Sequence, residues 1–179
     1  YAHLTKPYSN NGNEAKYSCT LLIPKSDTAT YDDIKSAIET AYEQGVSDKW
    51  KGARPTLRYP VIYDGDGTRP SGMPFGEECK GCWVVTASSK QMPQVVHQCN
   101  IRVQLAETDI YSGMYARVTL NFYPYDSSGN RGVGCGLGNV MKTRDGEPLS
   151  GRVNAETDFA DFAQSSNTTA TNPITGMPW

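Results

Sequence analysis

The longest run of alternating apolar and polar residues lies between Tyr115 and Asp126. Side chains of a β-strand point alternately to opposite faces, so this run predicts a strand with one core-facing row. The core-facing row comprises Ala116, Val118, Leu120, Phe122 and Pro124. The opposite row comprises Tyr115, Arg117, Thr119, Asn121, Tyr123 and Tyr125. Lys, Glu, Ser and Thr would serve solubility better than three tyrosines, so this row is the first candidate for a binding surface.

Similar reasoning predicts the other elements of the chain. Residues 1–13 are polar and turn-rich, which indicates a loop or an edge segment. Strands are expected at 16–24, 56–67, 81–89, 93–105 and 131–142, the last paired with 115–126 through a hairpin turn at 126–130. One helix is expected, capped by Thr28 or Thr30 and ended by Gly45, with an apolar stripe of Ile34, Ala37, Ile38, Ala41 and Tyr42.

The pattern predicts a mainly β fold, a small closed barrel or sandwich of five or six strands with one helix between early strands. A hydrophobic content of 37% excludes a disordered chain. No apolar run approaches the roughly 20 residues that cross a bilayer, so no membrane partner is expected. After Arg152 the composition shifts toward Ser, Thr and Asn, which predicts a folded domain over 1–162 and a flexible C-terminal tail over 163–179.

The net charge of -2 does not by itself indicate a nucleic-acid partner. Acidic residues are concentrated, however, in the helical segment 26–48 and in the segment after Val153. Outside these two segments the chain has 16 basic and 10 acidic residues, and a charged ligand responds to such a local excess of charge. Five cysteines, an odd number in a chain of this length, favour a reducing compartment over a disulfide scaffold.

The tyrosine row combines aromatic rings with Arg117 and small hydrogen-bonding groups, which suits an unpaired nucleic-acid strand. Bases stack on rings, and phosphates need nearby cations. Cross-strand packing or a covering partner explains the tyrosines about equally well when they are considered alone. The glycines at alternate positions of the partner strand are Gly132, Gly134, Gly136 and Gly138. They indicate either a flat floor that a ligand approaches closely or the curvature of a barrel.

Catalytic and metal-binding motifs are weak. Cys79 and Cys82 form a CxxC pair, but no second pair completes a zinc site. The segment 64–67 resembles half of a calcium loop without its remaining ligands, so a tight turn is expected. The two histidines, His3 and His97, form no nucleophile, base and acid set. No cofactor, metal or enzymatic activity is therefore expected.

Several segments resemble, in this order, a family of bacteriophage single-stranded DNA-binding proteins. The most specific are "LIPK" (22–25), "DGD" (64–66), "YSG" (111–113) and "GEPL" (146–149), within a resemblance that covers residues 14–162. The family implies an OB-fold, a small barrel that binds single-stranded DNA without sequence preference. It also implies protection of DNA during phage replication or recombination, in the cytoplasm of the infected bacterial host.

The predicted DNA-binding residues come from the strand pattern and not from the family. They are Tyr115, Arg117, Tyr123 and Tyr125 on the long strand, Arg102 on a neighbouring strand, and Lys142 and Arg144 beyond the glycine strand. The tail ends in Trp179, and it is either a docking segment for phage or host replication or recombination proteins or an unstructured end. A homodimer is left open. The alternative function is a structural or assembly β-domain of a phage that uses the tyrosine-rich strand as a protein interface.

Overall fold

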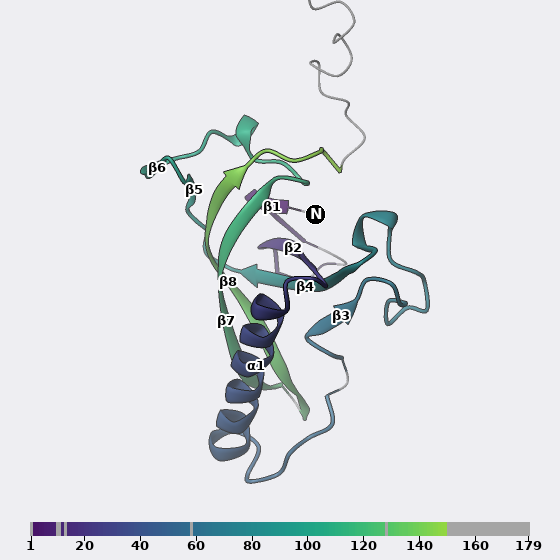
Figure 1. Ribbon diagram of the computed structural model, residues 1–179. Helices are drawn as coiled ribbons and strands as arrows, with labels where there is room; N and C mark the ends of the chain where they lie inside the picture. The colour runs from purple at the N-terminus through teal and green to yellow at the C-terminus, as the bar shows by residue number, and fades with distance from the viewer. Residues whose placement is uncertain (1, 10–11, 13, 58, 128, 150–179) are drawn as a thin grey trace, which may run out of the picture. The chain divides into compact units, whose positions relative to one another are not determined.

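The computed structural model describes residues 2–9, 12, 14–57, 59–127 and 129–149. In this part of the chain the elements are β1 (Ala2–Tyr8), β2 (Lys16–Pro24), α1 (Thr28–Asp48), β3 (Ile62–Asp64), β4 (Cys82–Ser89), β5 (Val95–His97), β6 (Asn100–Gln104), β7 (Tyr115–Ser127) and β8 (Asn130–Arg144), with short 3-10 turns at Glu77–Cys79 and Glu107–Asp109 (Figure 1). The mainly β class and the helix between early strands are confirmed. The strands number eight instead of five or six. The predicted boundary at 162 and the tail at 163–179 lie outside the described residues.

The strands form one sheet in the order β1-β2-β4-β8-β5-β6, with β3 attached to β4 and β7 attached to β8. The β7–β8 ladder is antiparallel and is the longest pairing, whereas β4 and β5 pair in parallel with successive stretches of β8. The expected closure into a barrel is wrong, because within the described residues β1, at one end of the sheet order, pairs neither with β6 at the other end nor with β7. The helix α1 packs against β7 and, to a lesser extent, against β8 (Figure 1).

The core lies on the inner faces of the strands and beneath α1. Its main cluster takes residues from five strands and one residue from the helix, namely Leu4, Cys19, Ile23, Ile34, Val85, Ala87, Val95, Cys135, Leu137 and Val140. A second cluster joins the helix to the lower ladder through Ala41, Tyr42, Trp50 and Val133. Burial of these apolar side chains is the main source of stability. It also fixes which face of the ladder points to water.

The N-terminal cap of α1 differs from the expected one. The cap is Asp27, whose Oδ1 accepts a hydrogen bond from the backbone N–H of Thr30 at 3.1 Å. Thr28 is already helical, and the Thr30 hydroxyl donates to the other carboxylate oxygen of Asp27 at 2.7 Å. These hydrogen bonds hold the pKa of Asp27 below its ordinary value. A carboxylate satisfies the free N–H groups of the first turn as well as a threonine hydroxyl would.

Gly45 is not the end of the helix, which continues to Asp48. A Cβ atom at position 45 would lie 2.6 Å from the Trp50 ring and 2.7 Å from Pro124 Cβ on β7. The missing side chain therefore permits close packing between the helix, Trp50 and the ladder. The indole N–H of Trp50 also donates to the carbonyl of Tyr125 at 3.1 Å, which ties the lower end of β7 to this cluster.

Two of the sequence segments that carry the family resemblance, "LIPK" and "DGD", are in contact through Lys25. Its ammonium lies 2.6 Å from Asp64 Oδ1 and 2.6 Å from Asp66 Oδ2. These contacts lower the pKa of both carboxyl groups and raise that of Lys25. Residues 64–67 form the expected tight turn, and the lysine supplies the cation that its carboxylates need. Lys25 also lies over the half-buried Trp83, whose ring stacks on Tyr31 with centroids 4.6 Å apart.

Candidate nucleic-acid interface

The outer row of β7 is at the surface, as the alternation predicts. Tyr115 is 49% exposed and Tyr123 is 44% exposed, while Tyr125 is half-buried. Arg117 is exposed as well. In the row expected to face the core, Val118, Leu120 and Phe122 pack against the main cluster and Pro124 is buried, but Ala116 is exposed. The face that carries the tyrosines is therefore opposite to the core and to α1.

Two of the tyrosine rings lie across glycines of β8. Tyr123 pairs with Gly134 and Tyr125 pairs with Gly132 in the antiparallel register. A Cβ atom at Gly134 would lie 2.6 Å from Cζ of Tyr123, and one at Gly132 would lie 2.5 Å from Cζ of Tyr125. Rings that cover cross-strand glycines in this way are held in place by the sheet beneath them. Each ring then has one side against the backbone and the other side toward solvent.

Tyr115 sits at the upper end of the row and carries a cation. It pairs with Arg144, whose guanidinium carbon lies 3.6 Å from the centroid of the tyrosine ring. This distance is a close cation–π contact. Atom Cε2 of the ring would lie 2.9 Å from a Cβ at Gly146, so a third glycine lies close to this ring. The structure thus brings together Tyr115 and Arg144 as a stacked pair whose two side chains are both exposed.

Arg117 lies beside an irregularity of the ladder. Val118 pairs with Val140 and Leu120 pairs with Leu137, so β8 contains one extra residue between these pairs. Such a bulge bends the strand and breaks the regular pairing. A hollow of about 280 Å³ opens there, lined by Val96, Arg117, Val118, Thr119, Asn139, Val140 and Met141.

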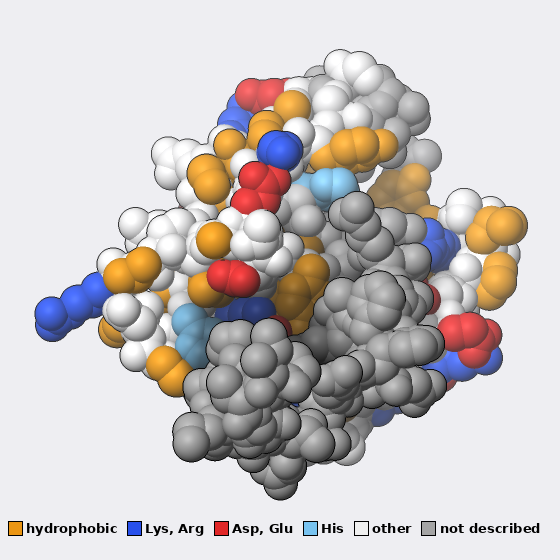
Figure 2. Space-filling view, turned by 90° about the horizontal axis from the view of Figure 1, so that it is seen from above, with side chains coloured by type: hydrophobic (Ala, Val, Ile, Leu, Met, Phe, Trp, Pro, Cys, Tyr) orange, Lys and Arg blue, Asp and Glu red, His pale blue; other side chains and the backbone are white. Residues whose placement is uncertain are grey.

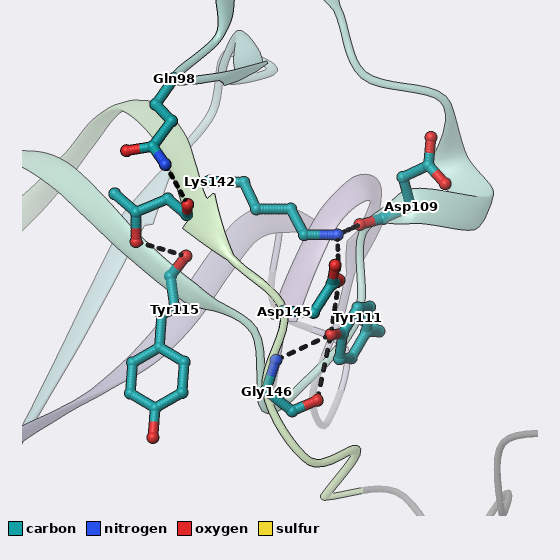
Figure 3. A network of polar contacts seen from close by, with 8 residues as sticks. Gln98, Asp109, Tyr111, Tyr115, Lys142, Asp145 and Gly146 are labelled. Carbon is teal, nitrogen blue, oxygen red and sulfur yellow. Dashed lines mark hydrogen bonds and ion pairs between the residues drawn. The ribbon is translucent and has the colours of Figure 1, made fainter. Parts of the chain in front are cut away.

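Lys142 is not the free cation that the sequence predicts. Lys142 is only 6% exposed, and its Nζ donates a hydrogen bond to the backbone carbonyl of Asp109 at 2.9 Å (Figure 3). The same nitrogen lies 2.7 Å from Asp145 Oδ1 and 4.9 Å from the ring centroid of Tyr111. The bulge in β8 is the cause, because one extra residue moves the following side chains to the other face. Lys142 therefore points inward although the glycine at 138 points outward.

The network around Lys142 joins the segment before β7 to the segment after β8. The Tyr111 hydroxyl donates to Asp145 Oδ1 at 2.8 Å and accepts from the backbone N–H of Gly146 at 3.0 Å (Figure 3). Hydrogen bonds from Lys142 and from Tyr111 hold the pKa of the Asp145 carboxyl below its ordinary value. We call residues 109–113 together with 142 and 145–149 the clasp.

The backbone of the clasp is tightly packed. Gly113 has a φ of +111°, and a Cβ atom there would collide with the carbonyl of Glu147. The backbone N–H of Leu149 donates to the carbonyl of Ser112 at 2.9 Å. The "YSG" and "GEPL" segments of the sequence are thus in direct contact.

Arg102 is not on a strand adjacent to β7. It lies on β6, and both β5 and β8 separate β6 from β7 in the sheet order. Its side chain is exposed, as are Ile101 at 66% and Val103 at 58%. Figure 2 looks down on this end of the molecule and shows hydrophobic side chains at its surface, with basic atoms projecting beyond them. The structure does not bring Arg102 together with the tyrosine row.

The cysteines and carboxylates form no metal centre in the described residues, where no group of three or more potential ligands is found. Burial raises the pKa of Cys79 and of Cys82. It raises that of Cys19 to about 11 and that of Cys135 to about 12, so these thiols are in their protonated, less reactive form. None of the described helices combines the length and the apolar character needed to cross a membrane.

Residues 1–169 match the family model described as "Enterobacter phage Enc34, ssDNA-binding protein". The chain belongs to this family. Putative protein p50 of Acyrthosiphon pisum secondary endosymbiont phage 1 is 29% identical over 161 residues, which are 84% of this chain and 82% of the relative. The resemblance that the four sequence segments indicated is confirmed.

Solved structures agree with this assignment. The single-stranded DNA-binding protein from bacteriophage Enc34, in complex with ssDNA, is 29% identical, covers 83% of each chain and superposes with a TM-score of 0.69. The single-stranded DNA-binding protein gp2.5 of bacteriophage T7 is 18% identical, covers 96% of this chain and 92% of its own, and has a TM-score of 0.55. The second likeness concerns the fold alone.

The sequence analysis did not predict a stacked pair of aromatic rings on the first strand, β1. His3 and Tyr8 stack with their centroids 4.8 Å apart, on a segment expected to be a loop or an edge. The segment is the edge strand β1, with Leu4 buried in the core. The alternation of Ala2 and Leu4 with polar residues is a strand signal, but it is too short to be distinguished from a loop.

Proposed function

We propose that the protein binds single-stranded DNA without sequence preference through the outer face of the β7–β8 ladder. Bases stack on Tyr115, Tyr123 and Tyr125, and phosphates contact Arg117 and Arg144. The observation that carries this proposal is the row of solvent-facing rings supported by glycines, in a chain that belongs to a family of single-stranded DNA-binding proteins.

Stacking is the main attractive contact in this proposal. An aromatic side chain contributes about 1–3 kcal/mol per stacked base, and every base offers a flat face, so the contact tolerates any sequence. Tyr123 and Tyr125 rest on glycines, which limits the positions that their rings can take. Rings ordered before binding lose less conformational entropy when a base arrives, and this favours affinity.

Phosphate contacts supply the second part. Arg117 is exposed beside the hollow at the bulge, and the Arg144 guanidinium covers the Tyr115 ring. A guanidinium on a ring can pair with a phosphate and also present its own flat face. Lys142 is left out of this set because its ammonium is already held inside the clasp. Arg102 remains a predicted contact for DNA that extends past the ladder toward β6.

The biological role follows from the binding mode. We propose a non-catalytic protein that coats and protects DNA during phage replication or recombination, in the cytoplasm of the bacterial host. Family membership disfavours the alternative of an assembly domain that uses the tyrosines as a protein interface. Docking of replication or recombination proteins through the tail at 163–179, with Trp179 at its end, and formation of a homodimer remain predictions.

A titration of the full chain with oligo-dT, monitored by intrinsic fluorescence, tests the proposal. Stacking on the tyrosines should quench the emission, and the affinity should fall as salt rises. The logarithm of the binding constant should decrease with the logarithm of salt by about 0.7 for each phosphate neutralised on a single strand. An unquenched, salt-insensitive protein that self-associates would support the assembly alternative instead.

A further inference from the structure

The edge strand β1 carries an aromatic pair at the surface. The rings of His3 and Tyr8 stack with centroids 4.8 Å apart and planes 13° apart. Tyr8 is 56% exposed, more than any tyrosine of β7. The pairing of β1 with β2 is irregular between these two residues, which brings side chains five positions apart onto the same face. No part of the function proposed above uses this pair.

The stack shares one face of the sheet with the tyrosine row. Direct pairings run across five strands from β1 to β7, in the line His3, Ser18, Ser88, Gly136 and Asn121. Residues that are directly opposite on neighbouring strands point to the same face. Asn121 and Tyr123 are two positions apart on β7 and therefore share that face too. With strands about 4.8 Å apart, the line spans about 19 Å.

Among the described residues, the line between the two aromatic sites carries only small side chains. Ser18, Ser88 and Gly136 along the line are only half-buried, whereas their neighbours Cys19 and Ala87 point into the core. The helix α1 contributes to the core clusters on that inner side, so it does not cover the line. A strand of DNA that leaves the Tyr123 ring can therefore cross β8, β4 and β2 without meeting a bulky side chain on this line.

A basic residue accompanies the stack. Tyr8 pairs directly with Lys16, and the lysine is exposed on the same face. The nearby carboxylate of Glu14 is paired with Lys90 at 2.7 Å. A ring with a cation beside it repeats the chemistry of Tyr115 and Arg144 at another strand of the same face.

We propose that the His3–Tyr8 stack is a second nucleobase site, with Lys16 contacting a phosphate, for the same DNA strand that stacks on β7. The inference rests on the proposed function and extends it, because it gives the strand a path across the sheet. The two sites share one strand of DNA, so each raises the effective concentration of bases at the other.

Titrations of the wild type, Tyr8→Ala, Tyr8→Phe and Tyr123→Ala with two oligo-dT strands test this path. The long strand has roughly 16 nucleotides and the short strand roughly 4. On the long strand Tyr8→Ala should weaken binding about 5- to 140-fold, the loss of one stacked base. Tyr8→Phe keeps the ring and should bind within about twofold of the wild type. On the short strand, which reaches only one site, Tyr8→Ala should cost no more than about twofold.

The outcomes separate this inference from the function on which it rests. If Tyr123→Ala weakens binding to the long strand and Tyr8→Ala does not, the path across β1 is wrong and the stacking site on β7 stands. An equal loss for Tyr8→Phe and Tyr8→Ala would also overturn it, because the ring would then not be the contact. If the wild type binds neither oligonucleotide, the proposed function itself fails. Circular dichroism should show equal unfolding temperatures, since Tyr8 is mostly exposed.

Discussion

The clasp lies where β7 begins and β8 ends, and the tyrosine row lies along β7. Both contain tyrosine and basic residues, yet the side chains of the two regions are in opposite states. In the clasp the Lys142 ammonium and the Tyr111 hydroxyl each contact several groups of the chain itself. On the tyrosine row the rings of Tyr115 and Tyr123 are about half exposed, and the Arg144 guanidinium is at the surface. The two regions therefore differ in the exposure of their aromatic and basic side chains and not in residue identity, and we infer that exposure decides which of them can contact DNA.

This difference predicts that changes in the clasp lower stability, whereas changes in the tyrosine row lower DNA affinity. A variant that lowered both stability and DNA affinity to a similar extent would contradict this prediction. Three matched pairs of substitutions test this prediction, beginning with the pair expected to have the largest effect.

Gly113→Ala should destabilise the protein by about 3 kcal/mol, because it adds backbone strain and a collision with the Glu147 carbonyl. Gly129→Ala is the matched control. Gly129 also has a positive φ, +83°, but a Cβ atom there meets nothing within 4 Å. Gly129→Ala should lower the free energy of unfolding by about 1 kcal/mol, from backbone strain alone. Urea unfolding measures both, and equal losses would show that the contact between residues 113 and 147 contributes nothing.

Tyr123→Ala should weaken binding to oligo-dT by about 1–3 kcal/mol, the contribution of one stacked base. Its effect on the free energy of unfolding should be smaller, since the side chain is 44% exposed and lies on the face opposite to the core. Tyr123→Phe removes only the hydroxyl and serves as the control, with affinity close to the wild type. Fluorescence titration and urea unfolding of the same samples give the two readouts. A stability loss without an affinity loss would make Tyr123 a packing residue.

The strand pattern was sufficient to predict which residues of β7 face water from Arg117 to Pro124, where burial alternates. It was wrong for Ala116, which was expected to face the core and is exposed. The same reasoning failed for Lys142 on β8. An extra residue lies between Leu137 and Val140, and another irregularity precedes Arg144, so the face changes twice within a few positions. Nothing in the local sequence fixes where an inserted residue bulges, since that depends on the pairing with β7. Barrel closure and the position of β6 failed for the same reason, because both depend on contacts between distant segments.

The smallest effect is expected from removing a single cation. Arg117→Met should reduce the slope of log affinity against log salt by about 0.7, the share of one phosphate contact. Lys142→Met should leave this slope unchanged, because its ammonium already faces Asp109 and Asp145. It should instead lower stability by about 1 kcal/mol, since the carbonyl of Asp109 loses its donor. Titrations at several salt concentrations, with urea unfolding, measure both quantities.

The pH dependence of Lys142→Met adds a second check on the clasp. In the wild type Lys142 holds the pKa of Asp145 below its ordinary value, so this contact stabilises the fold above that ordinary pKa. The stabilisation is lost as the pH falls through the lowered pKa of the folded state. The gap in stability between wild type and Lys142→Met should therefore be largest near pH 7 and should narrow in acid, while Arg117→Met shows no such narrowing. A salt slope that changed for Lys142→Met as much as for Arg117→Met would mean that the clasp opens to let DNA reach its lysine.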